Sequence, residues 1–180
     1  IKNEKFVVFL GDNIMTHPIN DFVKFFNKSM AEAFLLLCEV DNPTQFGIAE
    51  INEQKISKIV EKPKDPKSNL AVTGIYFFTP TLFDILPRLK PSWRNELEIV
   101  DALQLMIEQN KLIDFETITE FWKDTGTPDD IINANTKILE NLDYELTDKQ
   151  NFKCQISGKS SIGSGTILEK NIQIIGPVLI

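Results

Sequence analysis

The sequence has few of the residues on which metal clusters, disulfide scaffolds and histidine-based mechanisms depend. Its 180 residues include one histidine, His17, and two cysteines, Cys38 and Cys154, which lie far apart and form no Cys-x-x-Cys motif. The single histidine argues against a multi-histidine metal site and against a histidine general base. The cysteine spacing argues against a zinc ribbon and a disulfide framework, and is typical of reduced thiols.

The sequence also lacks long apolar runs and an excess of positive charge. No apolar run reaches the roughly 18 residues that predict a membrane span, and no basic and then apolar leader opens the chain. The 19 basic and 26 acidic residues give a formal net charge of -7, which is unlike a nucleic-acid-binding protein. We therefore expect a soluble cytoplasmic protein that binds neither nucleic acid nor a membrane.

Strand and helix patterns alternate over much of the chain. Phe6 to Leu10 is a short apolar run typical of a strand buried on both faces, and helical spacing follows between Asn20 and Met30. A strand pattern returns from Ala33 to Val40. This order predicts an α/β fold with a mostly parallel sheet, in which ligands gather at the carboxyl ends of the strands. Asp12, directly after the first strand, would lie at that edge.

Further elements are expected along the first domain. Two strand-like runs flank Asn52-Glu53-Gln54 and predict a hairpin between Phe46 and Ile59. The other expected strands are Ala71 to Phe78 and Lys111 to Thr117, and the other expected helices are Thr81 to Leu89, Ile99 to Asn110 and Asp129 to Leu142.

Residues 146–180 follow a different pattern from residues 1–145. An aliphatic residue recurs every six positions, at Ile156, Ile162, Leu168, Ile174 and Ile180. This period predicts the start of a parallel β-helix, with Gly158, Gly163 and Gly165 at tight corners. The alternative is a pair of ordinary strands with accidental spacing. We therefore divide the chain into a first domain, residues 1–145, and the start of a repeat domain, residues 146–180.

Both ends of the chain predict further sequence beyond them. The chain has no initiator methionine and enters its first apolar run within a few residues, as though it began inside a domain. A repeat stack this short leaves its last coil uncovered, since such arrays need about three or more repeats for stability. We expect the natural protein to be longer.

Two aspartates are candidate metal ligands. Asp12 lies between Gly11 and Asn13, and Asp124 lies just before Thr125-Gly126. Two carboxylates that converge at a sheet edge suit Mg²⁺, which takes one or two protein carboxylates and completes its octahedron with water and substrate phosphates. For either residue alone the alternative is an ordinary turn, since asparagine and glycine tolerate left-handed backbone and aspartate caps local amides.

A pair of opposite charges and one glycine are further candidates. Glu61 and Lys62 stand at a strand end, where neighbouring side chains point to opposite faces, so we expect that they do not pair with each other. The lysine could meet a phosphate and the glutamate sugar hydroxyls; the alternative is a solvated strand end. Gly74 inside a strand marks either close approach of a ligand or a bulge. Trp93 and Trp122 are interpreted as packing residues.

Six short blocks of sequence carry a family resemblance when taken together and in order. They are Gly11-Asp12-Asn13, Gln45-Phe46-Gly47, Glu61-Lys62-Pro63, Ser68-Asn69-Leu-Ala-Val72-Thr-Gly74-Ile-Tyr76, Glu96-Leu-Glu98-Ile-Val-Asp101 and Trp122-Lys-Asp124-Thr-Gly126-Thr-Pro. These blocks resemble the nucleoside-diphosphate-sugar pyrophosphorylases, a nucleotidyltransferase family, and especially its glucose-1-phosphate thymidylyltransferases. The resemblance spans about residues 5–140, and the hexapeptide repeat is similar to the left-handed β-helix of the family's long forms.

The resemblance implies roles for individual residues. Asp12 and Asp124 correspond to the ligands of Mg²⁺, and Lys62 to the residue that holds the sugar phosphate. Glu61 and Glu96 correspond to residues that hydrogen-bond sugar hydroxyls. The residues implied to line the same substrate pocket are Gly47, Val72, Gly74 and Tyr76.

The implied reaction is attack by an oxygen of a sugar 1-phosphate on the α-phosphorus of a nucleoside triphosphate, which releases pyrophosphate. The implied substrates are dTTP and glucose 1-phosphate, and a homo-oligomer is expected because related tails commonly assemble subunits. The same chemistry with UTP or GTP, and a non-catalytic regulatory relative that binds sugar nucleotides, remain alternatives.

The sequence also departs from the family pattern. The family's opening glycine-rich loop, with its arginine and following lysine, has no counterpart among these 180 residues. We therefore expect the chain to be inactive by itself. Lys123 stands where an apolar residue is common and Val100 where threonine is common, and both are mild changes.

Overall fold

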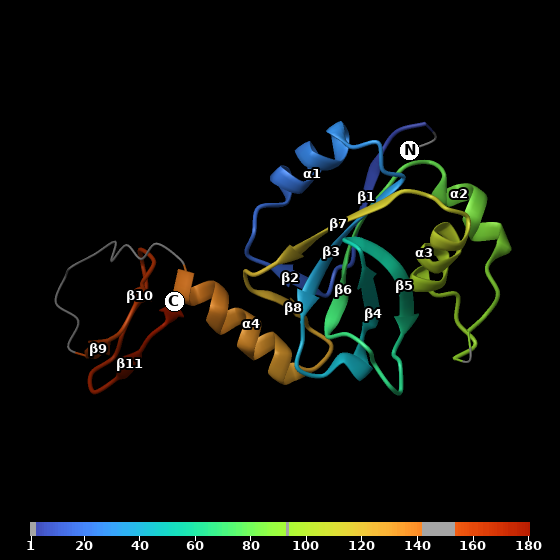
Figure 1. The fold of residues 1–180 in the computed structure, drawn as a ribbon. Coiled ribbons are helices and arrows are strands. Elements are labelled where there is room, and N and C mark those ends of the chain that lie inside the picture. Colours follow the sequence, from blue (N-terminus) through green and yellow to red (C-terminus); the bar gives the residue numbers. More distant parts are fainter. Residues whose placement is uncertain (1–2, 93, 142–153) are drawn as a thin grey trace. The chain divides into compact units, whose positions relative to one another are not determined.

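The computed structural model describes residues 3–92, 94–141 and 154–180 (Figure 1). The chain forms two compact units, Ile1–Asp124 and Thr125–Ile180. The predicted boundary between residues 145 and 146 falls outside the described residues.

The first unit is a curled sheet with helices against both faces. Its strands run in the order β5-β4-β6-β3-β7, and β1 also pairs with β6. Strands β2 and β8 form a separate two-stranded sheet. The strands are β1 (Phe6–Phe9), β2 (Asn13–Met15), β3 (Ala33–Glu39), β4 (Gly47–Asn52), β5 (Lys55–Glu61), β6 (Leu70–Phe78), β7 (Ile113–Ile118) and β8 (Trp122–Asp124). The helices are α1 (Ile19–Lys28), α2 (Leu82–Ile85), α3 (Ile99–Glu108) and the 3₁₀ turns η1 (Pro43–Gln45) and η2 (Leu86–Arg88).

The central strand β3 explains the two-sided core. Its run Ala-Phe-Leu-Leu-Leu is fully buried, and successive side chains point to opposite faces. Phe34 and Leu36 pack in the cluster that contains α1, whereas Leu35 and Leu37 pack in the cluster that contains α2 and α3. Figure 1 shows these helices on opposite sides of the sheet. The predicted α/β architecture is confirmed.

The prediction of a mostly parallel sheet is wrong for the described part of the chain. In this sheet β3 and β7 pair in parallel, whereas β1–β6, β3–β6, β4–β5 and β4–β6 are antiparallel. The strand, helix, strand pattern does make β1 and β3 run in the same direction. However, β6 inserts between them and is antiparallel to both, so they are not neighbours. Sequence periodicity carries no information on such an insertion.

The predicted hairpin around Asn52-Glu53-Gln54 is confirmed. It joins β4 to β5, and both Glu53 (φ 47°) and Gln54 (φ 62°) adopt left-handed backbone. Two successive residues at positive φ match the twist of an antiparallel hairpin, although asparagine and glycine are the usual residues there. The connection is too short for a parallel crossover, which needs a dozen or more residues.

The second unit contains a helix and two parallel strand pairs. Helix α4 (Pro128–Asn141) precedes β9 (Gln155–Ser157), β10 (Ser160–Ser161), β11 (Gln173–Ile175) and β12 (Val178–Leu179). Gln155 lies opposite Gln173 and Ser160 opposite Val178, so each strand bonds to a partner three six-residue periods away. Of the predicted stack, Ile162 and Ile174 are buried and Ile180 is 44% exposed.

Across the described ranges, no helix has both the length and the apolar character needed to traverse a lipid bilayer.

Lys5 fixes the end of α1 to the start of β1. Its Nζ donates hydrogen bonds to the carbonyl oxygens of Phe26 (2.6 Å) and Ser29 (2.8 Å), and it lies 4.5 Å from the centre of the Phe26 ring. The last carbonyls of a helix have no partners within the helix, so a cation there satisfies them and the helix dipole together.

We predict that Lys5→Met lowers the free energy of unfolding of the complete protein by about 1.5–3 kcal/mol, because it removes charged hydrogen bonds and keeps the aliphatic stem. Urea unfolding measures the change. The control is Lys24→Met on the solvent face of α1, whose exposed pair with Asp21 should contribute less than about 0.5 kcal/mol. Equal effects of the two substitutions would contradict the prediction.

Candidate functional site

The candidate site lies along one edge of β6, between the part that pairs with β1 and the part that pairs with β4. On this edge β1 pairs with Ile75 to Phe78 and β4 pairs at Ala71, which leaves an opening between them. Leu10, just after β1, donates its N–H to the carbonyl oxygen of Gly74 at 2.9 Å. A hollow of about 210 Å³ lies at this opening.

The hollow is lined by nearly all of the predicted site residues. The predicted residues that line it are Asp12, Gly47, Glu61, Lys62, Val72, Gly74, Tyr76 and Asp124. Glu96 does not line it; its carboxylate contacts Arg94 Nη2 at 2.9 Å and is 57% exposed. Segments from four strands and two loops thus meet at one position in the first unit.

The two aspartates come together through the pairing of β2 with β8. These strands are antiparallel, with Asn13 opposite Asp124, and Asp12 directly precedes β2. Both carboxylates line the hollow, and carboxylate oxygens are suitable ligands for a divalent cation. Among the described residues no group of three or more His, Cys, Asp or Glu side chains could hold a metal. A cation here would therefore need water or substrate oxygens as further ligands, which is typical of Mg²⁺.

Tyr76 lines the same hollow as these aspartates. Burial raises the pKa of the Tyr76 hydroxyl far above its usual value. The negative charges that add to this rise are, in decreasing order, those of Glu61, Asp12 and Asp124. The hydroxyl is protonated at neutral pH, as that of any ordinary tyrosine is, and can donate a hydrogen bond.

Glu61 and Lys62 face the same hollow, contrary to the expectation that they point to opposite sides. Lys62 has left-handed backbone (φ 43°), which ends the alternation of side chains at the end of β5. Its Nζ lies 3.9 Å from Glu61 Oε1, at the limit of an ion pair. Burial and the nearby Glu98 raise the pKa of the Glu61 carboxyl, while Lys62 and Arg94 oppose the rise.

Arg94 contacts two residues that line the hollow, and the sequence analysis missed it. Its Nη1 lies 3.6 Å from Glu61 Oε1 and 3.4 Å from Glu98 Oε1, and its Nη2 contacts Glu96. One guanidinium group therefore forms ion pairs with three carboxylates. Ser92 holds this loop, because its Oγ donates to Glu98 Oε1 at 3.0 Å and accepts the N–H of Arg94 at 3.1 Å. The available signal was an arginine two residues before the block that begins at Glu96.

Asn13 and Trp122 were also missed as site residues. Asn13 is 7% exposed, and Trp122 Nε1 donates to its Oδ1 at 2.8 Å. Trp122 does pack, against Phe46 with ring centres 5.7 Å apart, but it also lines the hollow. Both residues lie in the quoted sequence blocks, beside Asp12 and Asp124. Trp93 lies outside the described residues.

Gly47 is packed closely against two neighbouring side chains. A Cβ atom at this position would approach Val100 Cγ2 to 2.7 Å and Glu61 Oε2 to 3.1 Å. Any larger residue would therefore displace Val100 or Glu61, two residues that also line the hollow.

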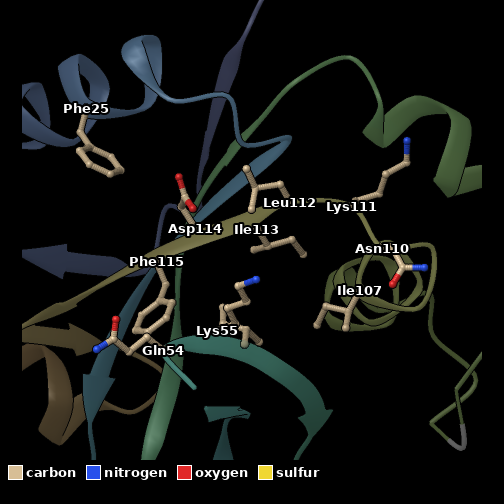
Figure 2. Close-up of a pocket in the computed structure, with 11 residues that line it drawn as sticks. Phe25, Gln54, Lys55, Ile107, Asn110, Lys111, Leu112, Ile113, Asp114 and Phe115 are labelled. Carbon is tan, nitrogen blue, oxygen red and sulfur yellow. The ribbon is translucent and has the colours of Figure 1, made fainter. Parts of the chain in front are cut away.

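A larger cavity of about 660 Å³ lies elsewhere in the first unit (Figure 2). Figure 2 shows it between Phe25, the β4–β5 turn with Gln54 and Lys55, and the start of β7. Among the described residues that line it, Asp114 alone has a carboxylate, which accepts a hydrogen bond from Ser29 Oγ at 2.6 Å. This cavity contains none of the predicted site residues and lacks convergent acids, so the smaller hollow is the candidate site.

Comparison with known proteins identifies the family of the chain. Residues 1–141 match the family model described as nucleotidyl transferase. The chain is 36% identical over 180 residues to the glucose-1-phosphate thymidylyltransferase of Streptomyces antibioticus, covering 99% of this chain and 50% of the relative. It is 44% identical over 141 residues to the low-salt glycan biosynthesis nucleotidyltransferase of Haloferax volcanii, covering 78% of this chain and 40% of the relative.

A solved structure of UDP-glucose pyrophosphorylase complexed with UDP-glucose is similar in fold, with a TM-score of 0.69 and 29% identity over 79% of this chain and 58% of that one. The chain spans half or less of the length of the two curated relatives. Because the family model covers most of the chain, and the fold agrees, the chain belongs to the nucleotidyl transferase family.

Proposed function

We propose that the complete protein containing this chain is a Mg²⁺-dependent glucose-1-phosphate thymidylyltransferase. It would transfer a thymidylyl group from dTTP to glucose 1-phosphate, forming dTDP-glucose and releasing pyrophosphate. The observation that most supports this proposal is the β2–β8 pairing, which brings Asp12 and Asp124 to a hollow that also contains Glu61 and Lys62.

The hollow contains charged groups that suit both the phosphate and the hydroxyls of a sugar phosphate. Lys62 supplies a cation for the phosphate, and Glu61, held by Arg94, supplies an acceptor for sugar hydroxyls. Gly47, Val72 and Tyr76 line the same hollow and would form the walls of the sugar pocket. We retain the predicted sugar contact of Glu96 as a proposal that requires its carboxylate to leave Arg94.

The proposed reaction leaves little covalent chemistry to the protein. The side chains hold the sugar phosphate in line with the α-phosphorus and balance the charge of the phosphates. Mg²⁺, when bound by Asp12 and Asp124, would withdraw negative charge from the phosphate oxygens. Gly74 and Tyr76 limit the space around these groups.

The choice of base is tested with the purified complete protein. We expect the highest kcat/KM with dTTP when dTTP, UTP and GTP are each supplied with glucose 1-phosphate and pyrophosphate release is measured. A preference for UTP or GTP would replace the thymidylyl assignment and keep nucleotidyl transfer; the similarity to UDP-glucose pyrophosphorylase makes UTP the main rival. No release with any of the three would favour a non-catalytic regulatory protein.

The two aspartates are tested in the same protein. We predict that Asp12→Asn and Asp124→Asn each lower Mg²⁺-dependent synthesis at least about 100-fold, because removing a metal ligand should cost no less than removing a residue that only orients one. Circular dichroism should show an unchanged fold. Asp84→Asn, an exposed aspartate on α2, is the control and should retain activity. Full activity in either site variant would remove the metal assignment.

We also propose that residues 154–180 form a coil of a left-handed parallel β-helix through which the complete protein assembles as a homo-oligomer in the cytoplasm. The support is the pairing of β9 with β11 and of β10 with β12, each three repeats apart, around buried Ile162 and Ile174. We predict an oligomer in sedimentation velocity. A monomer at micromolar concentration would contradict the assembly.

A further inference from the structure

Asn13 occupies the opening in the β6 edge that a strand would otherwise fill. Gly74 N–H donates to Asn13 Oδ1 at 2.9 Å, so a side-chain amide takes the place of a backbone carbonyl. At the same level the register between β3 and β6 shifts between Leu35 and Leu37, on the other edge of β6. The sheet is thus irregular on both sides of Gly74, and bulges are frequent beside active sites.

The orientation of the Asn13 amide is fixed by its partners. Oδ1 accepts two N–H groups, from Gly74 and from Trp122 Nε1 at 2.8 Å. Neither donor can accept a hydrogen bond, so a flipped amide would set its NH₂ group against both. The remaining group, Nδ2, therefore faces Asp12 and donates to its Oδ1 at 2.9 Å.

The Asn13 amide fills the space beside Gly74 that a side chain would occupy. A Cβ atom on Gly74 would lie 2.4 Å from Asn13 Nδ2 and 2.7 Å from its Cγ. These distances exclude any side chain at Gly74 while Asn13 stays in place. The glycine in this strand, expected to mark either ligand approach or a bulge, here admits a neighbouring side chain.

We propose that Asn13 is a positioning residue, whose amide ties Asp12 to β6 and Trp122 and so sets the direction of the Asp12 carboxylate relative to Asp124. The inference rests on the proposed function, because it matters only if the two carboxylates share a cation. Asn13 lies opposite Asp124 in the β2–β8 ladder, so one residue fixes both the spacing of the aspartates and the orientation of one of them.

The test measures binding of Mn²⁺, a cation that carboxylates and water also accommodate, to the complete protein by electron paramagnetic resonance without nucleotide. We predict that Asn13→Ala raises the Kd for Mn²⁺ about 10- to 100-fold, the usual effect of removing a group that orients a metal ligand. Asn20→Ala, at an exposed position on α1, is the matched control and should bind as the wild type does.

A merely structural role predicts a different result. Loss of folded protein would reduce the number of Mn²⁺ sites and leave the Kd of the remaining sites unchanged. If Asn13→Ala does not fold, Trp122→Phe tests the same contact, because it keeps the ring and removes one of the two donors that fix the amide. We expect a Kd raised about tenfold in this variant.

The outcomes separate this inference from the proposed function. If the wild type does not bind Mn²⁺, or Asp12→Asn binds it as tightly as the wild type, the proposed metal site fails. If the wild type binds, Asp12→Asn does not, and both Asn13→Ala and Trp122→Phe keep the wild-type Kd, the positioning role of Asn13 is wrong and the metal site stands.

Discussion

The geometry of the site depends on the short antiparallel ladder between β2 and β8. Each strand has three residues, yet the ladder joins the start of the chain to a segment beyond α3 and β7. So short a pair is marginal by itself in water. It is held by burial of Trp122 against Phe46 and by the amide of Asn13, which reaches the main sheet. The packing of Trp122 and Asn13 therefore sets the distance between the carboxylates of Asp12 and Asp124.

Negative charge exceeds positive charge around Glu61 in the hollow. Glu61 and Glu98 lie beside Arg94, with Asp101 near enough to raise the pKa of Glu61 further. Because the folded state holds the Glu61 proton more tightly than the unfolded chain, ionising Glu61 costs stability as the pH rises past its usual pKa. A bound group that donates hydrogen bonds to Glu61 would offset this cost. A bound hydrogen-bond donor would therefore stabilise the ionised carboxylate of Glu61.

Sequence periodicity identified the local elements well and the sheet order poorly. The strand β1, the amphipathic α1 and the β4–β5 hairpin follow from residue spacing, because these depend on neighbours in sequence. The prediction that β1 is buried on both faces is wrong for the described residues, since Val7 and Phe9 are exposed. The position of β6 between β1 and β3 depends on contacts across the fold, and no local pattern encodes it. The unit that contains the repeat retains the expected six-residue spacing in its strand pairs.

For the site, sequence blocks predicted residues whose chemistry is evident from their type. Asp12, Asp124, Glu61 and Lys62 are charged residues at strand ends and line the hollow. Asn13 was interpreted only as a residue that tolerates a turn, since its role depends on the absence of a side chain at Gly74. Lys62 faces the hollow through a left-handed backbone conformation that is rare for lysine and that alternation of side chains could not anticipate.

The parallel pairs near the end of the chain have a consequence for how such a segment can change in length. Each strand residue there is paired with the residue eighteen positions away, as Gln155 is with Gln173. In the proposed β-helix, deleting or duplicating an entire coil would leave each remaining residue with an equivalent neighbour. Adding a single amino acid would instead shift every later inward side chain out of its row. Natural variation in this segment should therefore come in steps of one coil.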